Sequence, residues 1–356
     1  MINNIFAKLL GTILEKKLGS WAEENNLRAL SQAGFRQHQS GIDHLVALRY
    51  CIDTAKGQRK RTFICFVDFS KAFDSVDRGK LWKRLQDVQT PPQLLQAIQR
   101  LYAKVLIQLK NCGTPESATL CSSIGVKQGC PLSLTLFGIF IDSFETWMEE
   151  VPVEHGIIVG SLVLHLLLFA DDVALISKIG KGLQNMLQVL DKFCIYSGLK
   201  VNVAKTKVMV CGTRTQIPTF YIGDKQVENV TIYKYLGVEF SSNYKWGECI
   251  SQRIASGMKA LYALRNKCKK EGILSCEIRR KLFRAIIQPV VLYGSVVWSP
   301  GLPVKWWKAI ENVQKQFLIG EFKVKQQVQY DILLLEADLL PLEVEALYQF
   351  ISYTQQ

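Results

Sequence analysis

The stretch LVLHLLLFADDVALIS, residues 162–177, places two adjacent aspartates between two apolar runs. The apolar runs predict the strands of a hairpin from Gly160 to Lys178, with Asp171 and Asp172 at its tip. Neighbouring carboxylates repel each other, and their apolar surroundings raise the cost of ionising both. A hard divalent cation such as Mg²⁺ relieves that repulsion and prefers oxygen ligands. The stretch therefore favours a metal site, and two solvated turn aspartates are the alternative.

A third aspartate stands at the end of another apolar run. The segment TFICFVDF, residues 62–69, is dense in aromatic and β-branched residues, so it predicts a buried strand that ends at Asp68. The end of a strand is where a scaffold presents side chains to a cleft. An isolated aspartate there is more often a cap or turn residue, and position alone leaves both roles open for Asp68.

The remaining pattern predicts a mixed chain without repeats or low-complexity tracts. We expect helices over residues 5–28, 43–55 and 183–197 and after Asp77, with N-caps at Asp43 and Asp77, and strands over residues 208–212 and 233–240. From about residue 245 to 288 the pattern becomes helical and basic. We expect a boundary after residue 240, between an α/β part and a mostly helical part.

The 356 residues carry 44 Lys and Arg against 31 Asp and Glu, a formal net charge of +13. Such a balance suits a polyanionic partner, such as nucleic acid. Much of the excess lies between Arg253 and Arg284, where a solvated basic helix face is the alternative. Ten cysteines without a CxxC pair and four histidines without ligand spacing argue against a zinc site and indicate reduced thiols in an intracellular protein. The most apolar stretch, residues 159–176, is interrupted by His165 and two aspartates, which disfavours a membrane span.

Six blocks of this sequence occur in the order typical of one enzyme family. They are QAGFRQHQSGIDHL at 32–45, VDFSKAFDSVD at 67–77, GVKQGCPLS with LTLF at 125–137, LLFADDVALIS at 167–177, GLKVNVAKTKVM at 198–209 and YLGVEF at 235–240. Together they resemble the reverse transcriptases of LINE-type (non-LTR) retrotransposons. The resemblance spans residues 1 to about 240 and, more weakly, the helical remainder, including LFRAIIQPVVLYGSVVW at 282–298.

The resemblance implies an α+β fold: a right-hand polymerase with fingers, a palm made of an antiparallel sheet packed on helices, and a helical thumb. Fingers and palm would span residues 1–240, and the thumb with a C-terminal extension residues 241–356. It implies an RNA-directed DNA polymerase that joins deoxynucleoside triphosphates to a DNA primer on an RNA template. Such an enzyme would act in the nucleus and would not bind a membrane. Two Mg²⁺ ions, with Mn²⁺ as a substitute, would be held by Asp68, Asp171 and Asp172.

The resemblance also assigns residues to nucleotide and nucleic acid. Phe73 matches the position whose ring lies against the sugar, and a core phenylalanine is the alternative. The other nucleotide-binding matches are Gln128, Gly129, Lys205 and Arg36, and the primer grip matches Tyr235, Leu236, Gly237 and Val238. Asp74 is expected to order the local turn. We further expect residues 253–284 to form two helices along the template–primer duplex, with phosphate contacts from Lys267, Lys269, Lys270, Arg279 and Arg280.

Three features depart from the family pattern. The family has a finger segment with an arginine–proline block before the match to MINNIFAKLL, and this chain is expected to start after it, as a truncated form. Leu134 stands where the family has proline, and neither an endonuclease nor a Cys/His nucleic-acid-binding knuckle is found. The alternatives to an active polymerase are therefore a catalytically inactive retrotransposon remnant and a maturase-like RNA-binding protein.

Overall fold

The computed structural model describes residues 5–103, 105–109, 118–159, 162–212, 216–272 and 275–355. The chain forms two compact units, and each is described by itself. The first comprises the residues up to His44 together with Tyr50–Thr231; the second comprises Leu45–Arg49 and the residues from Ile232 onward. The sequence places a boundary after residue 240, whereas the units divide after Thr231, so residues 232–240 belong with the helical unit.

The first unit mixes helices and strands. Its helices are α1 (Ile5–Glu24), α2 (Gly41–Gly57, part of which belongs to the second unit), α3 (Ala72–Ser75), α4 (Arg78–Asp87), α5 (Pro92–Tyr102), α6 (Leu132–Met148), η1 (Val153–His155) and α7 (Gly180–Ser197). Its strands are β1 (Thr62–Val67), β2 (Leu106–Leu109), β3 (Ala118–Cys121), β4 (Ile157–Val159), β5 (Leu162–Leu164), β6 (Leu166–Phe169), β7 (Asp172–Ser177), β8 (Lys207–Cys211), β9 (Phe220–Ile222) and β10 (Lys225–Asn229). The α+β class expected from the sequence is confirmed.

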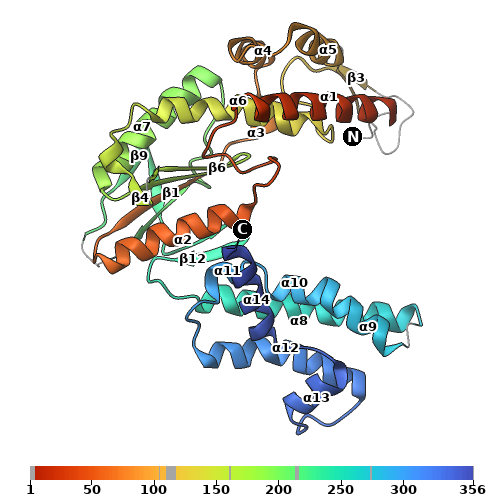
Figure 1. The fold of residues 1–356 in the computed structure, drawn as a ribbon. Coiled ribbons are helices and arrows are strands. Elements are labelled where there is room, and N and C mark those ends of the chain that lie inside the picture. The colour runs from red at the N-terminus through yellow and green to blue at the C-terminus, as the bar shows by residue number, and fades with distance from the viewer. Residues whose placement is uncertain are drawn as a thin grey trace. The chain divides into compact units, whose positions relative to one another are not determined.

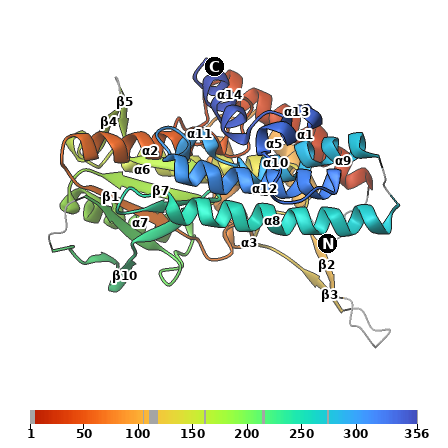
Figure 2. The same cartoon turned by 90° about the horizontal axis from the view of Figure 1, so that it is seen from below.

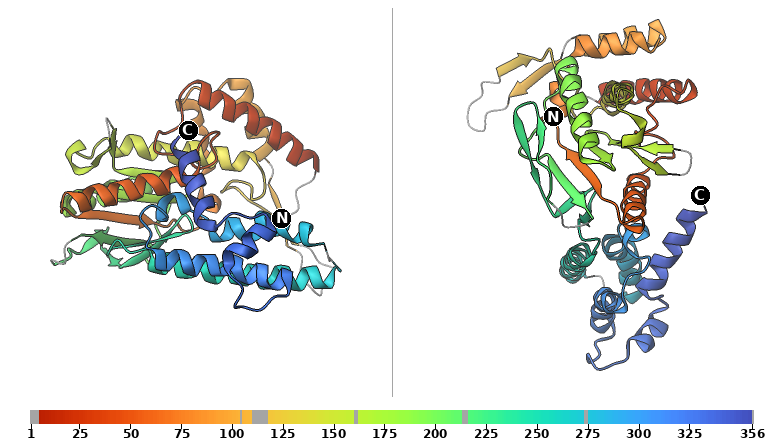
Figure 3. Two further views of the ribbon diagram at one scale, coloured as in Figure 1. Left: turned by 60° about the horizontal axis from the view of Figure 1, so that its bottom comes forward. Right: turned by 90° about the vertical axis from the view of Figure 1, so that its left-hand side faces the viewer.

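The central sheet has the strand order β6-β7-β1-β8-β10-β9. Strand β1 lies in its interior and pairs antiparallel with both β7 and β8. An antiparallel sheet is expected from the sequence. The observed sheet is mixed, because β8 and β10 run parallel. Every residue of β1 is buried, because helices cover both faces of the sheet. Helices α6 and α7 lie on one face, and the part of α2 that belongs to the first unit lies on the other (Figures 1 and 3). A continuous apolar run is what such a doubly covered strand requires.

The hairpin predicted around the adjacent aspartates is present. Strands β6 and β7 pair antiparallel from Leu166 with Leu175 to Phe169 with Asp172. Ala170 and Asp171 therefore form its two-residue tip, and Asp172, which the sequence also places at the tip, is the first residue of β7. The predicted starting residue, Gly160, lies outside the described residues, and β5 pairs with β4 in a separate hairpin.

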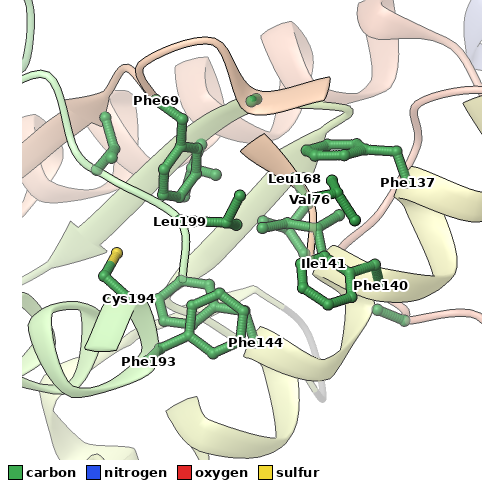
Figure 4. Close-up of a cluster of buried hydrophobic side chains, with 14 of the residues drawn as sticks. Phe69, Val76, Phe137, Phe140, Ile141, Phe144, Leu168, Phe193, Cys194 and Leu199 are labelled. Atoms are coloured by element: carbon green, nitrogen blue, oxygen red, sulfur yellow. The ribbon is translucent and has the colours of Figure 1, made fainter. Parts of the chain in front are cut away.

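A large apolar core lies on the side of the sheet that α6 and α7 cover. Alternate residues of β1 and its continuation, Phe63, Cys65, Val67 and Phe69, belong to it, as the period of two in a strand requires. Helix α6 contributes most of its length, and Figure 4 shows Phe137, Phe140 and Phe144 from this helix in one cluster with Phe69, Leu168 and Phe193. Each fully buried phenylalanine stabilises the fold by about 1.5–3 kcal/mol. The strand ends that carry the three aspartates thus emerge from a rigid base.

The second unit is a short hairpin followed by helices. Its elements are β11 (Ile232–Tyr235), β12 (Val238–Ser241), α8 (Gly247–Lys270), α9 (Cys276–Leu282), η2 (Phe283–Ile287), α10 (Gln288–Val291), α11 (Ser295–Trp298), α12 (Val304–Phe322), α13 (Tyr330–Ala337) and α14 (Leu342–Thr354). Figure 2 shows the long α8 beside α12. Within the described part of the chain, no helix is both long and apolar enough to cross a membrane.

The helices predicted in the basic segment exist. Apolar residues at helical spacing predict their buried faces, namely Ile254, Met258, Leu261 and Leu264 in the first and Ile278, Leu282 and Ile286 in the second. The prediction for the second helix is wrong. On α8, Leu261 and Leu264 are buried as the spacing indicates. Phe283 and Ile287, the first and last residues of the π-helical turn η2, are buried, whereas Ile278, before this turn, and Ile286, within it, are exposed. A π turn adds one residue per turn, so it shifts the buried face.

The two predicted N-caps have different outcomes. Asp77 caps α4, because its carboxylate accepts a hydrogen bond of 3.0 Å from the backbone N–H of Lys80. Asp43 is not the N-cap of α2. Ser40 takes that position, and the Asp43 carboxylate, one turn into the helix, accepts from the Ser40 backbone N–H at 2.7 Å. The Ser40–Asp43 pair is a capping box, in which the two residues satisfy backbone groups of the first helical turn.

A buried ion pair ties the segment after α1 to α6. Arg28 Nε lies 2.6 Å from Asp142 Oδ2, and the two side chains are only 2% and 1% exposed. Burial raises the pKa of the Asp142 carboxyl, while attraction to Arg28 opposes that rise. Removing one partner of such a pair leaves an uncompensated buried charge, which is far more costly than losing an exposed pair.

We predict that Asp142→Asn, which preserves side-chain volume, lowers the free energy of unfolding by about 3–5 kcal/mol because Arg28 loses its counterion. Chemical denaturation with circular dichroism measures the change. The matched control is Glu150→Gln, which removes the exposed pair of Glu150 with Lys192 and should stay within about 0.5 kcal/mol of the unmodified protein. Equal effects of the two substitutions would contradict the prediction.

Candidate active site

The register of the central sheet brings the three aspartates to one edge. Val67, the last residue of β1, pairs with Val173 of β7. Continuing this antiparallel register by one residue sets Asp68 opposite Asp172, and Asp171 comes directly before Asp172 at the hairpin tip. Residues directly opposite on paired antiparallel strands have Cβ atoms roughly 4.5–5.5 Å apart. Three carboxylates that are distant in the sequence therefore share one strand edge.

Backbone contacts with residues 198–206 hold Asp68 in place. The Asp68 N–H donates to Thr206 Oγ1 at 3.2 Å, and the Asp68 carbonyl accepts from the Asn202 N–H at 2.8 Å. An isolated bridge between Phe69 and Val201 extends the pairing. The block GLKVNVAKTKVM thus supports the strand end that carries Asp68.

The carboxylates interact electrostatically. Burial raises the pKa of Asp171, and the nearby Asp68 adds to that rise. For Asp172, burial and the charges of Asp171 and Asp68 raise the pKa to about 6. Asp172 is solvent-exposed as a residue, yet neighbouring protein atoms still displace water from around its carboxyl. The site therefore holds more negative charge than its surroundings compensate.

The donor set fits hard divalent cations. All three side chains offer carboxylate oxygens, which Mg²⁺ prefers, and the raised pKa values are those expected of carboxylates without a counterion. Among the described residues, no group of three or more His, Cys, Asp or Glu side chains is arranged to hold a metal ion. The three carboxylates are therefore near one another without converging on one point, and their fit to a cation rests on the chemistry of their oxygens.

The loop after residue 125 packs beside α3. Gln128 Nε2 donates to both carboxylate oxygens of Asp74, at 2.8 and 3.0 Å, so Asp74 orders this loop. Gly129 has φ +78° and open space where a Cβ would stand. The Phe73 ring stacks on Phe137 with ring centroids 4.4 Å apart. The structure thus gives Phe73 a packing role, and the sugar contact stays a prediction.

The other two predicted nucleotide-binding residues, Lys205 and Arg36, lie in different environments. Lys205 is exposed, in the loop that supports Asp68. Arg36 is engaged within the protein: Nε and one terminal nitrogen donate to the two oxygens of Glu23, at 2.9 and 2.7 Å, and the other donates to the Ala29 carbonyl at 2.7 Å. These contacts give Arg36 a structural role, and its contact with nucleotide stays a prediction.

Residues 233–240, predicted as one strand, lie in the β11–β12 hairpin of the second unit, and the predicted primer-grip residues, Tyr235 to Val238, surround its turn. Leu236 and Gly237 make its turn, with φ +42° and +85°. The Tyr293 hydroxyl donates to the Leu236 carbonyl at 2.8 Å, and Arg253 donates to the Gly237 carbonyl at 2.6 Å. From the sequence, Arg253 is expected to belong to the exposed basic surface of residues 253–284. Tyr293, within the family-like segment 282–298, is not among the predicted site residues.

The basic residues of the second unit separate into two groups. Lys267, Lys269 and Lys270, at the end of α8, are exposed. The two arginines are bound within the unit: Arg279 pairs with Glu321 at 2.7 Å, and Arg280 donates to the Ala337 carbonyl. The lysines are therefore the better candidates for phosphate contacts.

Comparison with known proteins supplies the family. The model of the family described as reverse transcriptase (RNA-dependent DNA polymerase) matches residues 1–240. The Pol polyprotein of retrotransposable element R2DM of Drosophila melanogaster is 26% identical over 254 residues, covering 68% of this chain and 23% of that protein. A putative 115 kDa protein of element R1DM, from the same organism, is 23% identical over 355 residues, covering 98% and 33%. The chain thus spans a quarter to a third of these relatives.

Solved structures of telomerase are also similar to this chain. Apo telomerase from Candida tropicalis matches with a TM-score of 0.49 at 13% identity, over 87% of this chain and 51% of that one. Telomerase from Candida albicans, in complex with a fragment of telomeric RNA, matches with a TM-score of 0.45 at 13% identity, over 94% and 59%. Because the family model covers more than half of the chain and includes Asp68, Asp171 and Asp172, the chain belongs to the reverse transcriptase family and is related to the proteins of R2 and R1 non-LTR retrotransposons.

Proposed function

We propose that this chain is the RNA-directed DNA polymerase core of a non-LTR retrotransposon, acting in the nucleus. The observation that carries the proposal is the meeting of Asp68, Asp171 and Asp172 at one edge of the central sheet, in a chain of the reverse transcriptase family. The reaction joins a deoxynucleoside triphosphate to the 3′-hydroxyl of a DNA primer on an RNA template and releases pyrophosphate. It requires in-line positioning and charge neutralisation rather than a protein nucleophile.

The carboxylates would act as ligands and electrostatic organisers. Two Mg²⁺ ions, or Mn²⁺ in their place, would supply Lewis acidity toward the primer hydroxyl and the triphosphate. Asp68, Asp171 and Asp172 would hold the ions through their carboxylate oxygens. Charge compensation by the ions also explains why the fold tolerates carboxylates with raised pKa values.

Residues around the carboxylates would bind the nucleotide. Gln128, oriented by Asp74, and Gly129, whose backbone can approach a ligand closely, would contact the incoming nucleotide. Lys205, exposed beside the loop that holds Asp68, would meet the triphosphate. Phe73, which is only partly buried against the core, would limit the space for a 2′-hydroxyl. Arg36 would act through the structure of its segment, since its donors bind Glu23 and Ala29.

The second unit would bind the template and primer. The turn at Leu236 and Gly237 would hold the primer end. Lys267, Lys269 and Lys270 would contact phosphates without reading sequence, and Arg279 and Arg280 would support that surface from within.

A primer-extension assay on the purified chain tests the proposed function. With an RNA template, a DNA primer, Mg²⁺ and deoxynucleotides, the unmodified protein should extend the primer. Asp171→Asn, which removes one charge at constant size, should abolish extension and leave template binding nearly unchanged. Asp224→Asn, at an exposed position in the first unit, is the matched control and should retain activity. Lack of extension by the unmodified protein, despite tight binding of RNA, would favour an inactive remnant or an RNA-binding protein.

The carboxylates also predict how Mg²⁺ and pH affect stability. Folding raises the pKa of Asp172 from 3.8 to about 6. A carboxyl of this kind stabilises the folded state fully when the pH is below its unfolded-state pKa. That stabilisation is lost as the pH rises through its folded-state pKa. At about pH 8 the ion-free protein should therefore gain thermal stability from Asp172→Asn. Mg²⁺ should raise the melting temperature of the unmodified protein at that pH, and the rise should shrink below about pH 6, where protons compete with the metal. The absence of any Mg²⁺ effect at all pH values would refute the proposed metal site.

The exposed lysines predict a salt dependence. Each phosphate contact should contribute roughly 0.9 to the slope of log affinity against log salt on duplex DNA. Replacing Lys267, Lys269 and Lys270 together by Gln should therefore flatten the slope and weaken binding to all sequences alike, as fluorescence anisotropy can measure. The control removes the same charge from exposed lysines elsewhere in the second unit, Lys305, Lys308 and Lys325. If both triple variants change the slope equally, net charge rather than local contact is responsible.

A further inference from the structure

We propose that Gln32 is a positioning residue of the active site, whose side-chain amide holds the backbone of Ala170 in the conformation that presents Asp171 and Asp172. The inference rests on the proposed polymerase function, and all the groups involved belong to the first unit. Gln32 lies far from the aspartates in the sequence, yet its side chain is bound directly to the tip of their hairpin.

The contact between Gln32 and the hairpin consists of side-chain and backbone hydrogen bonds. Gln32 Oε1 accepts from the Ala170 N–H at 3.0 Å and from the Gly34 N–H at 2.8 Å. The flanking backbone pairs with β6: the Ala33 N–H donates to the Leu168 carbonyl at 2.9 Å, and the Leu168 N–H donates to the Ser31 carbonyl at 2.8 Å. Gln32 is 1% exposed, so water cannot replace these bonds easily.

Ala170 needs such support because of its backbone conformation. Its φ is +56°, in the left-handed region where a residue with a Cβ loses roughly 1–2 kcal/mol relative to the right-handed region. Conformations of this kind persist only where the surrounding structure determines them. Asp171 is the next residue, so a change in the backbone of Ala170 redirects the Asp171 carboxylate.

The buried ion pair fixes which way the Gln32 amide points. Gln32 Nε2 donates to Asp142 Oδ1 at 3.2 Å, while Arg28 Nε binds Asp142 Oδ2 at 2.6 Å. An ionised carboxylate can only accept hydrogen bonds. The amide nitrogen must therefore face Asp142, which leaves Oε1 to face the N–H groups of Ala170 and Gly34. A chain of polar contacts thus runs from Arg28 through Asp142 and Gln32 to the tip of the hairpin.

Two glycines make room for this chain. A Cβ on Gly34 would stand 2.3 Å from the Ala170 nitrogen, and a Cβ on Gly138 would stand 2.5 Å from a terminal nitrogen of Arg28. Both distances are below any normal contact, so both positions require glycine in this arrangement. Gly34 lies in the block QAGFRQHQSGIDHL, which gives that block a physical role at the aspartate hairpin.

The test is Gln32→Met, which keeps length and volume but offers neither donor nor acceptor to these groups. Since displacement of a catalytic group by about 1 Å can cost about 100-fold in rate, we expect kcat to fall by about 10- to 100-fold, with a much smaller change in the KM for deoxynucleotide. The control is Gln39→Met, the same change at an exposed position, which should leave kcat unchanged. A kcat unchanged in Gln32→Met would overturn the proposal.

A second substitution separates positioning from general stability. Ala170→Gly relieves the steric cost of positive φ, so in the Gln32→Met background it should restore kcat several-fold. If Gln32 only stabilises the fold, the glycine should leave kcat as low as in Gln32→Met whatever its effect on melting temperature, and that result would refute the positioning role.

Hydrogen exchange tests the inference without activity. Gln32→Met removes the acceptor of the Ala170 N–H, so that amide should exchange at least about 10-fold faster, whereas the amide of Ala174, inside the β-ladder, should be unchanged. Failure of the unmodified protein to extend primers would count against the proposed function alone. Unchanged exchange at Ala170 in the variant would count against the role of Gln32 alone.

Discussion

Repulsion among three carboxylates is the constraint to which the first unit is adapted. Ionised, uncompensated aspartates at one strand edge cost free energy, as the raised pKa values of Asp171 and Asp172 show. The pairing of β1 with β7 prevents the strand ends from separating, and the apolar core beneath them prevents the strands from shifting (Figure 4). A shift of one residue in register would turn every buried side chain of β1 to the opposite face. Hydrophobic burial thus stabilises an arrangement that electrostatics alone would disperse.

The two hairpins that carry proposed site residues are stabilised in the same way. Both have turns in left-handed conformations, at Ala170 in the first unit and at Leu236–Gly237 in the second. In each, side chains from elsewhere in the same unit hold the backbone of the turn: Gln32 for the first, and Arg253 with Tyr293 for the second. Residues distant in the sequence can thus determine the geometry of a turn whose own sequence permits several conformations.

Local patterns predicted the elements well and the side-chain contacts poorly. The apolar run of β1, the ADD hairpin and the α8 helix each have a periodicity that depends only on neighbouring residues. The left-handed Ala170 and the burial of Arg253 depend on partners far along the chain, so no window of sequence contains them. The same reason explains Arg279 and Arg280, which sit in a basic run yet bind Glu321 and the Ala337 carbonyl. Family resemblance located Asp68, Asp171 and Asp172 but gave no indication of what holds them.

The interior position of β1 has a consequence for synthesis of the chain on the ribosome. Strand β1 ends at Val67, but its partners β7 and β8 are complete only at Ser177 and Cys211. Chain synthesis adds roughly 5–20 residues per second, so the segment TFICFV stays unpaired for several seconds before its first partner strand has been made. Five apolar residues and a threonine, all of high β-propensity or buried in the fold, favour pairing between nascent chains while they are unpaired. The preceding basic run KGQRKR repels its copies on other chains, so it can protect the strand until its partners emerge.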